Sequence, residues 1–500
     1  MNRLILPKCF RVSVFFVSLL FCFSSFGQTN NSDKMIGGFV NNISNHLQEK
    51  VYVHTDRNYY LCGEILWFKT YVTNAANNKP LSLSKVVYVE IINKLHLPVL
   101  QGKIAIESGS GSGSFTLPLS LESGNYELRA YTNWMKNDSS NHYFKKIITI
   151  VNTTENLDPA IAKSKIGYAA QFFPEGGNLV YGLNSVVAFK LNNDSGNGVD
   201  GVGVVVDESQ DTVARFQSGK FGMGKFAFSP QTGKHYTAVV TLNDSSIIRK
   251  NLPDAYESGY VMHLTDEGNN LKVSISSANP FSQKIYLIAQ TNKHIDFSQE
   301  SFLQNNQAVF TLNKENLKEG ITQITLFTGD GKPLCERLYF KRPTKEMLIH
   351  AKADKQTFNK RDKVNIDLST TDESGNLLAA NLSASVFRLD SLHEKNGGNI
   401  FTYLWLTSDL KGFIENPEYY FKNDNAETND ALQNLLLTQG WRTFDWKNIS
   451  SNNKSSLTYI PENRGHIVIG KVTIEATGKP AENVLVYLSV PGKRVQLYGC

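Results

Sequence analysis

Cysteine is scarce in this sequence, with five residues in a chain of 500. Cys9 and Cys22 lie in the first 27 residues, which leaves Cys62, Cys335 and Cys500, far apart and odd in number. Secreted proteins that depend on disulfides carry many closely spaced cysteines. The scarcity therefore excludes a disulfide framework and is more typical of a bacterial envelope protein than of an animal extracellular protein.

An excess of charge of one sign is also missing. The formal net charge is +5, and three of those positive charges, Arg3, Lys8 and Arg11, lie in the first 27 residues, which contain no acidic residue. The rest of the chain thus has only two net positive charges. So small a charge predicts neither nucleic-acid binding nor a basic membrane-binding patch.

Long hydrophobic runs are absent after the first, 12–23, "VSVFFVSLLFCF". This run follows basic residues and precedes small ones, Ser25 and Gly27, which is the layout of a secretory signal peptide cleaved before Gln28. The alternative is a retained anchor, although the run is short for a membrane-spanning helix. We therefore expect an exported protein, located in the periplasm or at the outer membrane and cell surface.

Motifs for catalysis and for metal binding are missing as well. No two of the ten histidines lie two or four residues apart, and HExxH does not occur. "GSGSG", 109–113, matches a nucleophile-elbow pattern but lies in a low-complexity β region, where the required strand-to-helix turn is not expected. "FPEGG", 173–177, has no following helix and no Lys or Ser/Thr in phosphate-loop register. The sequence thus predicts no catalytic residue, no metal and no cofactor, and a protein that is not an enzyme.

What is present is alternation with a period of two. Runs such as "VYVHT", "VVYVEIIN" and "KKIITIV" are separated by Gly, Asn, Ser and Asp, and they predict a mostly β chain of tandem β-sandwiches of immunoglobulin-like or fibronectin-like type. The tract 108–114, "SGSGSGS", lies between such runs and is expected to be a long hairpin turn. Helical spacing is confined to a leader and to a short segment near 396–446, where Asn429 or Asp430 is a candidate N-cap and Gly440 a candidate end.

The expected organisation follows from these patterns. It comprises a signal peptide (1–27), a leader helix or linker (28–48), four sandwiches (49–155, 165–252, 253–343 and 344–395), a helical segment (396–446), a polar linker (447–464) and an incomplete β-sandwich (465–500).

Two internal repeats support tandem sandwiches. The stretches 193–206, 372–386 and 475–490 share a turn with Gly followed by an alternating apolar strand. The stretch 55–69, "TDRNYYLCGEILWFK", aligns without gaps to 353–367, "ADKQTFNKRDKVNID". Each copy reads as a strand, a turn and a second strand.

Cys-Gly-Glu, at 62–64, raises the question of a thioester. That chemistry needs a Gln carboxamide three residues after the cysteine, and this chain has Ile65 there. An alkyl side chain cannot acylate a thiol, and the repeat has Lys360 in place of Cys62. The sequence therefore predicts a structural turn, with Gly63 at positive φ.

The stretch 49–72, "EKVYVHTDRNYYLCGEILWFKTYV", resembles the second-domain signature of the alpha-2-macroglobulin family, with Cys62 where that family usually has Pro or Ala. The resemblance extends to 123–137 and is looser over 165–390, which is similar to later macroglobulin-type modules of Bacteroidetes envelope proteins. It implies a macroglobulin-like fold for the sandwiches. The residues that match the signature have an expected structural role: Asp56, Arg57, Tyr60, Gly63, Glu64 and Trp67.

The end of the chain carries a second resemblance. The stretch 465–490, "GHIVIGKVTIEATGKPAENVLVYLSV", resembles the opening of a carboxypeptidase regulatory-like domain, which often precedes the plug of a TonB-dependent receptor. About three strands of it precede residue 500, so we expect a domain that continues elsewhere. Trp441, Arg442 and Trp446 are a candidate interdomain dock near the end of the helical segment.

The family resemblance implies endopeptidase-inhibitor-like activity. Without a thioester such inhibition would be steric, with a cleavable bait in the polar part of 391–430 or in 447–463. The expected partner is then a protease. The alternative is a periplasmic or surface extension of a TonB-dependent uptake receptor, whose partner would be an outer-membrane barrel. An adhesion-like stalk is a third interpretation, because tandem sandwiches make good spacers.

Overall fold

The structure is a computed structural model that describes residues 47–155, 167–279, 283–387, 398–440, 457–467, 470–490 and 496–499. The predicted signal peptide and nearly all of the leader 28–48 lie outside these ranges. Within them, every helix is too short or too polar to cross a membrane.

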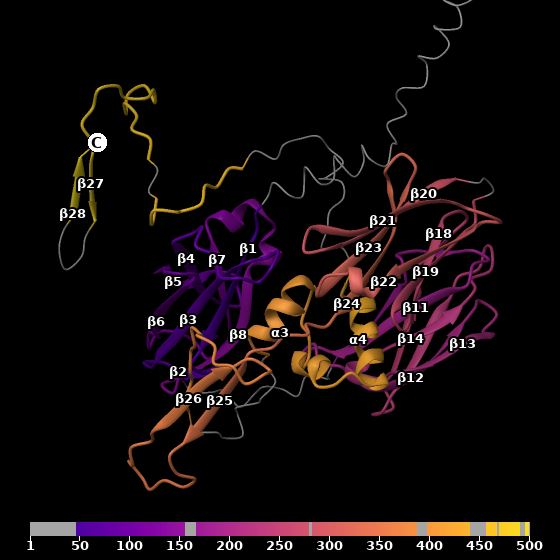
Figure 1. Ribbon diagram of the computed structural model, residues 1–500, viewed down its shortest axis with the longest axis horizontal. Helices are drawn as coiled ribbons and strands as arrows, with labels where there is room; N and C mark the ends of the chain where they lie inside the picture. The colour runs from indigo at the N-terminus through magenta and orange to yellow at the C-terminus, as the bar shows by residue number, and fades with distance from the viewer. Residues whose placement is uncertain are drawn as a thin grey trace, which may run out of the picture.

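The first sandwich packs a three-stranded sheet, in the order β1-β3-β6, against a five-stranded sheet, β2-β8-β7-β4-β5 (Figure 1). Alternating apolar side chains such as Val51, Leu66 and Leu128 point between the sheets and are fully buried. Its strands are β1 (Glu49–Thr55), β2 (Tyr59–Leu61), β3 (Ile65–Asn74), β4 (Val86–Ile92), β5 (Pro98–Ala105), β6 (Ser110–Thr116), β7 (Gly124–Thr132) and β8 (Phe144–Val151).

The Gly/Ser tract 108–114 is not the long hairpin turn that the sequence suggested. Most of it is strand β6, which pairs with β3. The turn is confined to Ser108 and Gly109, both at positive φ. Gly111 and Gly113 lie so close to β5 and to the ring of Phe68 that an added Cβ would come within 2.3 Å of Ala105 O and 2.7 Å of Phe68. The glycines therefore serve close packing between strands.

The second and third sandwiches also consist of two packed sheets each, and the strands within these sheets are antiparallel. The second has sheets β14-β11-β9 and β13-β12-β15-β16, and the third has β18-β19-β22 and β21-β20-β23-β24. A short strand of the second sandwich, β10, pairs in parallel with β17, which lies between the two sandwiches in sequence.

The strands of the second sandwich are β9 (Tyr168–Pro174), β10 (Leu179–Val180), β11 (Ser185–Asn193), β12 (Gly201–Val206), β13 (Thr212–Gln217), β14 (Met223–Phe228), β15 (Thr237–Leu242) and β16 (Ile247–Asn251). After β17 (Ala255–Tyr256), those of the third are β18 (Tyr260–Glu267), β19 (Asn270–Ser277), β20 (Lys284–Thr291), β21 (His294–Phe302), β22 (Gln307–Asn313), β23 (Gly320–Thr328) and β24 (Pro333–Lys341). The predicted mostly β architecture of tandem sandwiches is thereby confirmed.

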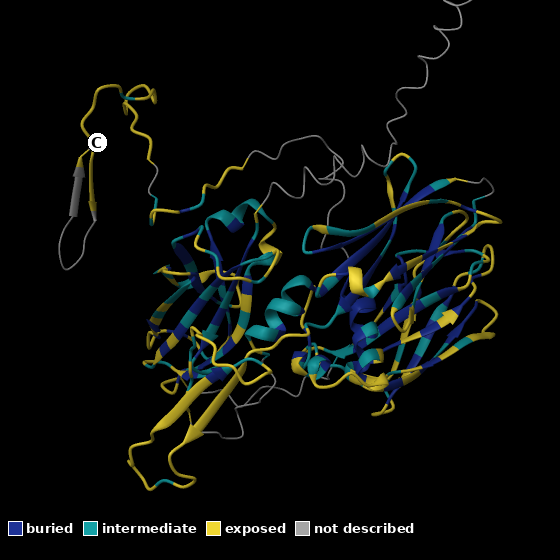
Figure 2. Ribbon diagram, viewed as in Figure 1, coloured by how far each residue is buried: buried dark blue, intermediate teal, exposed yellow. Residues whose placement is uncertain are grey.

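The range 344–395 differs from its expected fold, which was a fourth sandwich. Its described part contains one hairpin, β25 (Leu348–Ala353) with β26 (Ile366–Thr371). Figure 2 shows that this hairpin is largely exposed. A two-stranded ribbon has no second sheet to cover its apolar face, so Ile349 and Leu368 remain more than half exposed.

The turns that recur in the sequence are closed by similar backbone hydrogen bonds. Val199 N donates to Leu191 O, Leu378 N to Thr370 O, and Ala481 N to Val472 O, at 2.9 to 3.1 Å. The first sandwich has a turn with the spacing of the last of these, where Leu81 N donates to Val72 O. The bonded residues are eight apart in 191–199 and 370–378 and nine apart in 72–81 and 472–481, so two related turns, differing by one residue, recur in the chain.

The helical segment lies between the first sandwich and the other two (Figure 1). It contains α3 (Ile400–Trp405) and α4 (Ala426–Gln439). The N-cap of α4 is Asn425, whose Oδ1 accepts from Thr428 N at 2.9 Å, and not Asn429 or Asp430 as the sequence suggested. Gly440 is the C-cap, as expected. The strands β27 (Tyr487–Val490) and β28 (Gln496–Gly499) form a separate hairpin near the end.

Candidate functional site

The signature residues of the first sandwich form a closed corner between β1 and β3. The Tyr60 hydroxyl donates to Asp56 Oδ1 at 2.7 Å and accepts from Arg57 N at 3.1 Å. Asp56 Oδ1 also accepts from Trp67 N at 3.0 Å. Tyr60 is 2 % exposed, and burial, followed by the bond to Asp56, raises the pKa of its hydroxyl.

The other half of the corner is a turn around Gly63, at φ +87°. Glu64 Oε2 accepts from Leu61 N at 2.9 Å, and Glu64 Oε1 lies 3.3 Å from Arg57 Nη1. Gly63 N donates to Leu117 O at 2.7 Å, which joins the turn to the end of β6. The polar groups of the signature thus bind one another. Only the Trp67 side chain, at 57 %, is largely exposed.

The repeat copy reproduces the backbone of this corner, although Phe358 replaces Tyr60 and has no hydroxyl. Asp354 N donates to Asn365 O, and Asn359 N to Asp362 Oδ2, as Asp56 and Leu61 do in the first copy. Arg361 adopts φ +70° at the position of Gly63. The strand register is the same too, because Thr55 pairs with Phe68 in one copy and Ala353 with Ile366 in the other. A motif built twice with different side chains is architectural.

Cys62 lies beside this turn as a free thiol that contacts Leu121 O at 3.4 Å. Burial, with a smaller contribution from Glu155, raises the pKa of the thiol. A raised pKa lowers the thiolate fraction, so the environment does not activate the sulfur as a nucleophile.

Residues 381–383 of the predicted fourth sandwich lie against the sheet β1-β3-β6. Ser383 Oγ lies 2.7 Å from His54 Nδ1 and 2.8 Å from the Tyr71 hydroxyl. Lys69 Nζ donates to Leu382 O at 2.8 Å. No local signal in the sequence around His54 indicates that a segment more than 300 residues away docks on it.

A buried polar cluster joins the second sandwich, the third sandwich and α4. Glu175 follows β9 and accepts from Arg337 Nε of β24 at 2.9 Å, while Arg337 Nη2 donates to Gln433 of α4 at 2.7 Å. His263 Nδ1 of β18 lies 2.6 Å from Glu175 Oε2. Burial alone would raise the pKa of Glu175, but the hydrogen bond from His263 and the charge of Arg337 outweigh it and lower that pKa.

A cavity of about 350 Å³ adjoins this cluster, lined also by Lys225 and Asp266. Its charged groups are of both signs. The pattern of "FPEGG" excludes a phosphate loop but does not indicate that Glu175 joins two sandwiches, because its partners Arg337 and His263 come from distant strands.

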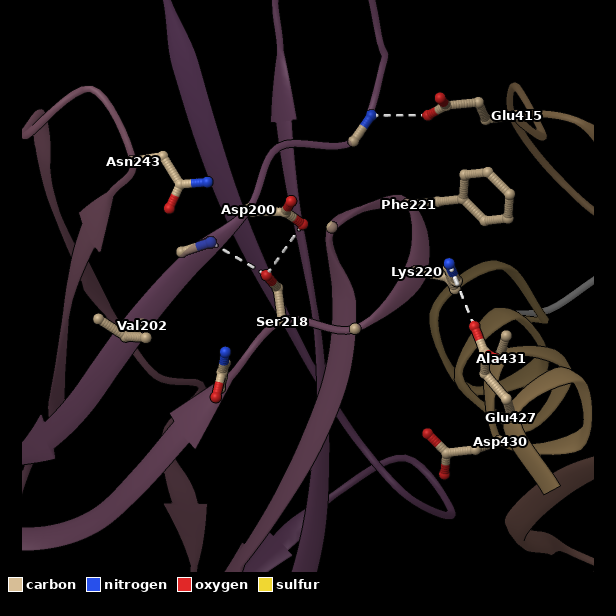
Figure 3. A pocket seen from close by; sticks show the side chains of 15 residues that line it. Asp200, Val202, Ser218, Lys220, Phe221, Asn243, Glu415, Glu427, Asp430 and Ala431 are labelled. Atoms are coloured by element: carbon tan, nitrogen blue, oxygen red, sulfur yellow. Dashed lines mark hydrogen bonds and ion pairs between the residues drawn. The ribbon is translucent and has the colours of Figure 1, made fainter.

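Figure 3 shows a wider groove between the second sandwich and α4, with a volume of about 610 Å³. Gly198 N donates to Glu415 Oε2 at 2.8 Å, and Lys220 Nζ lies 3.1 Å from Glu427 Oε1. Asp200 accepts from Ser218 Oγ at 3.4 Å. Much of this polarity thus holds the helical segment onto the sandwich.

Within the described ranges, no three His, Cys, Asp or Glu side chains are grouped so that they would hold a metal ion. The candidate dock of Trp441, Arg442 and Trp446 lies outside the described residues. The helical segment contacts the first sandwich through α3 and the turn that follows it. Tyr403 packs its ring 5.4 Å from that of Tyr52, and Lys50 pairs with Asp409 at 2.9 Å.

No family model matches the chain, and no curated protein matches it. Among solved structures, the chain is similar to alpha-2-macroglobulin of Escherichia coli in its native conformation, at 11 % identity over 64 % of this chain and 25 % of that one, with a TM-score of 0.18. A Salmonella alpha-2-macroglobulin mutant gives the same values. Domains 4–9 of the surface layer protein SbsC give 11 % identity over 66 % and 54 %, with a TM-score of 0.24.

The chain therefore spans about a quarter of the length of those macroglobulins. Superpositions at such scores do not place equivalent residues together, so they assign no residue role and no activity to this chain.

Proposed function

We propose that this protein is an exported, non-enzymatic binding and scaffold protein of the cell envelope, of macroglobulin-like type, which engages endopeptidases sterically and without a thioester. The resemblance of 49–72 to the macroglobulin signature supports the family. The main structural support is a shared core between the sandwiches and the helical segment.

That core contains side chains from three parts of the chain. It is formed by Met223 of the second sandwich, Leu338 and Phe340 of the third, and Leu406, Leu410, Ile414, Tyr420, Ala431, Leu432, Leu435 and Leu436 of the helical segment. All of these are nearly or fully buried. Apolar burial of this kind fixes neighbouring domains, whereas sandwiches joined by linkers alone would move independently.

The role of the signature is consistent with a scaffold. Its polar side chains bind one another within the corner. The Cys62 thiol, whose pKa is raised, faces the carbonyl of Leu121. Engagement of a protease would thus depend on the broad surfaces of the sandwiches and on a cleavable segment.

The structure narrows the choice of bait. Of the polar part of 391–430, residues 391–397 lie outside the described residues, and Leu406 and Tyr420 are fully buried. The run 422–427 is exposed, but Asn423 and Asn425 accept hydrogen bonds from Thr428, and Asp424 accepts one from Arg342, which hold that run in place. Of the second candidate, 447–463, the described residues 457–463 lie on the first sandwich, while 447–456 lie outside the described residues. We place the bait in 447–456.

The test uses the full chain with equimolar endopeptidases of different specificity. Mass spectrometry would map the cuts, and protease activity would be followed on a large protein substrate and on a small peptide. We expect early cuts within 447–456 and lower activity on the large substrate alone. Cuts elsewhere, or undiminished activity on the large substrate after cutting, would contradict the proposal.

A further inference from the structure

The segment 457–467 lies on one end of the first sandwich, more than 300 residues away in sequence. Figure 1 shows it beside that sandwich. It contacts the start and body of β4, the strand β5 and the 3-10 turn Trp134–Asn137 that follows β7. We call the surface formed by Lys85, Tyr88, Lys103, Asn133, Lys136 and Asn137 the clasp site.

The clasp site binds the backbone of the segment. The Asn137 side chain forms two hydrogen bonds with the backbone of one residue, since its Nδ2 donates to Tyr459 O at 2.7 Å and its Oδ1 accepts from Tyr459 N at 2.9 Å. Asn133 Nδ2 donates to Ile460 O at 2.9 Å. Lys85 N donates to Glu462 O at 2.9 Å. Pro461 has no amide hydrogen that would need a partner.

The clasp site also contacts side chains of the segment, those of Glu462 and His466. Glu462 is 1 % exposed, and its Oε1 accepts from the Tyr88 hydroxyl at 3.1 Å. His466 Nδ1 lies 2.7 Å from the same oxygen, and Lys103 Nζ lies 2.8 Å from His466 Nε2. A carboxylate this deeply buried must be recognised by specific partners, because its desolvation is costly.

A cation–π contact also holds the segment on the clasp site. Lys136 Nζ lies 5.5 Å from the ring centroid of Tyr459 and 4.9 Å from that of Tyr88, so one ammonium group connects the segment with β4.

We propose that the clasp site is a peptide-recognition site for a Tyr-Ile-Pro-Glu segment, and that the chain's own residues 459–462 are its intramolecular, displaceable ligand. The proposal does not depend on protease binding, because it concerns two parts of this chain.

Two observations indicate that the segment is displaceable. Glu462 Oε2 is buried and has no hydrogen-bond partner among the described residues, so the anchor is incompletely satisfied. Residues 441–456 separate the segment from α4, and a chain of that length reaches about 50 Å when extended. A linker of that length allows the segment to leave the site, while tethering raises its local concentration, so a free peptide has to compete with it.

The test uses the full chain with Glu462→Ala, which vacates the site, and Glu482→Ala as the matched control, since Glu482 is exposed. The probe is a fluorescein-labelled peptide with the sequence of 457–467, followed by anisotropy. We expect saturable binding to the Glu462→Ala chain, and at least ten-fold weaker binding to the wild-type and Glu482→Ala chains, where the tethered segment competes. A peptide with Ala in place of Glu should bind none of them.

Hydrogen exchange of the Lys85 amide checks the same proposal independently. Its protection should fall in the Glu462→Ala chain and return when the peptide is added, while the amides of β7 stay protected and show that the sandwich is folded. The proposal is overturned if the peptide fails to bind the Glu462→Ala chain, if adding Asn137→Ala to that chain leaves binding unchanged, or if the Lys85 amide stays protected in the Glu462→Ala chain.

Discussion

Glu175 and Arg337 form an ion pair at 2.9 Å in which the side chains are 2 % and 4 % exposed, and this pair connects the second sandwich to the third. The Arg337 guanidinium also donates a hydrogen bond to Gln433, so α4 is held at the same point. Because both charges are buried, each depends on the other for compensation. The pair therefore couples the positions of three parts of the chain.

Removing one member of this pair should be costly. Glu175→Gln leaves the Arg337 guanidinium buried without its anion, and we expect a loss of roughly 3–5 kcal/mol in the free energy of unfolding. Urea denaturation would measure it. Glu300→Gln is the matched control, because its pair with Lys284 is partly exposed, is screened by solvent and should contribute much less to stability. Equal effects of the two substitutions would contradict the prediction.

The double variant Glu175→Gln with Arg337→Met separates the cost of an unpaired charge from the value of the pair. We expect it to be more stable than Glu175→Gln alone, since no uncompensated charge remains buried. An additive further loss would show that the pair contributes more than its desolvation costs.

The same cluster should make stability depend on pH. The hydrogen bond to Glu175 raises the pKa of His263 above its usual value near 6.5, against the charges of Arg337 and Lys225, while Asp266 also lines the adjoining cavity. A raised folded-state pKa means that protonated His263 stabilises the fold fully below about pH 6.5, and that this contribution is lost as pH rises through the folded pKa.

His263→Gln should therefore flatten the stability curve above pH 6.5. Thermal unfolding followed between about pH 5.5 and 9 would show it, relative to wild type. His235→Gln is the control, because His235 and its partner Asp254 are both largely exposed. A wild-type slope that persists in the His263→Gln chain would assign the pH dependence to another group.

The signature corner gives a third prediction. Tyr60→Phe removes a buried hydroxyl that binds Asp56 Oδ1 and Arg57 N, and we expect a loss of roughly 1–3 kcal/mol in the free energy of unfolding. Tyr256→Phe, at a 58 % exposed side chain, should change stability by less than about 0.5 kcal/mol. Chemical denaturation of the two variants decides between an architectural role for Tyr60 and a role only in binding, which would leave stability unchanged.

How much the sequence predicted depends on the range of the interaction. The gap-free alignment of 55–69 with 353–367 corresponds to matching hydrogen bonds, because a corner is built from residues within about 15 positions. The docking of Ser383 on His54, and of Glu462 beside Tyr88, left no periodic trace in the sequence. Such contacts depend on how complete domains pack, and neither alternation nor turn residues encode that.

In the predicted fourth sandwich, the local pattern predicted the hairpin correctly but not its burial. Its opening hairpin has the register of β1 and β3, so local pattern identified the hairpin's form. However, Val364 is 48 % exposed where its equivalent, Leu66, is fully buried. Burial requires a second sheet, and the described part of 344–395 contains none.

The last prediction concerns the thiols. Cys335 is 3 % exposed, and burial raises the pKa of its thiol to about 12, so it should not react with a disulfide reagent at pH 8 until the chain unfolds. Cys62 is partly exposed with a raised pKa, so it should react slowly in the native chain. Cys62→Ala should remove that slow reaction.

Methylamine separates a free thiol from a thioester at Cys62. A thioester would be opened by the amine, releasing one thiol and adding the mass of the amine to the chain. Because Ile65 stands where an acyl-donating Gln would be needed, and because the Cys62 sulfur contacts Leu121 O, we expect no added mass and an unchanged thiol titre. A gain of one thiol that disappears in Cys62→Ala would contradict a purely structural turn and would make covalent capture the mechanism to pursue.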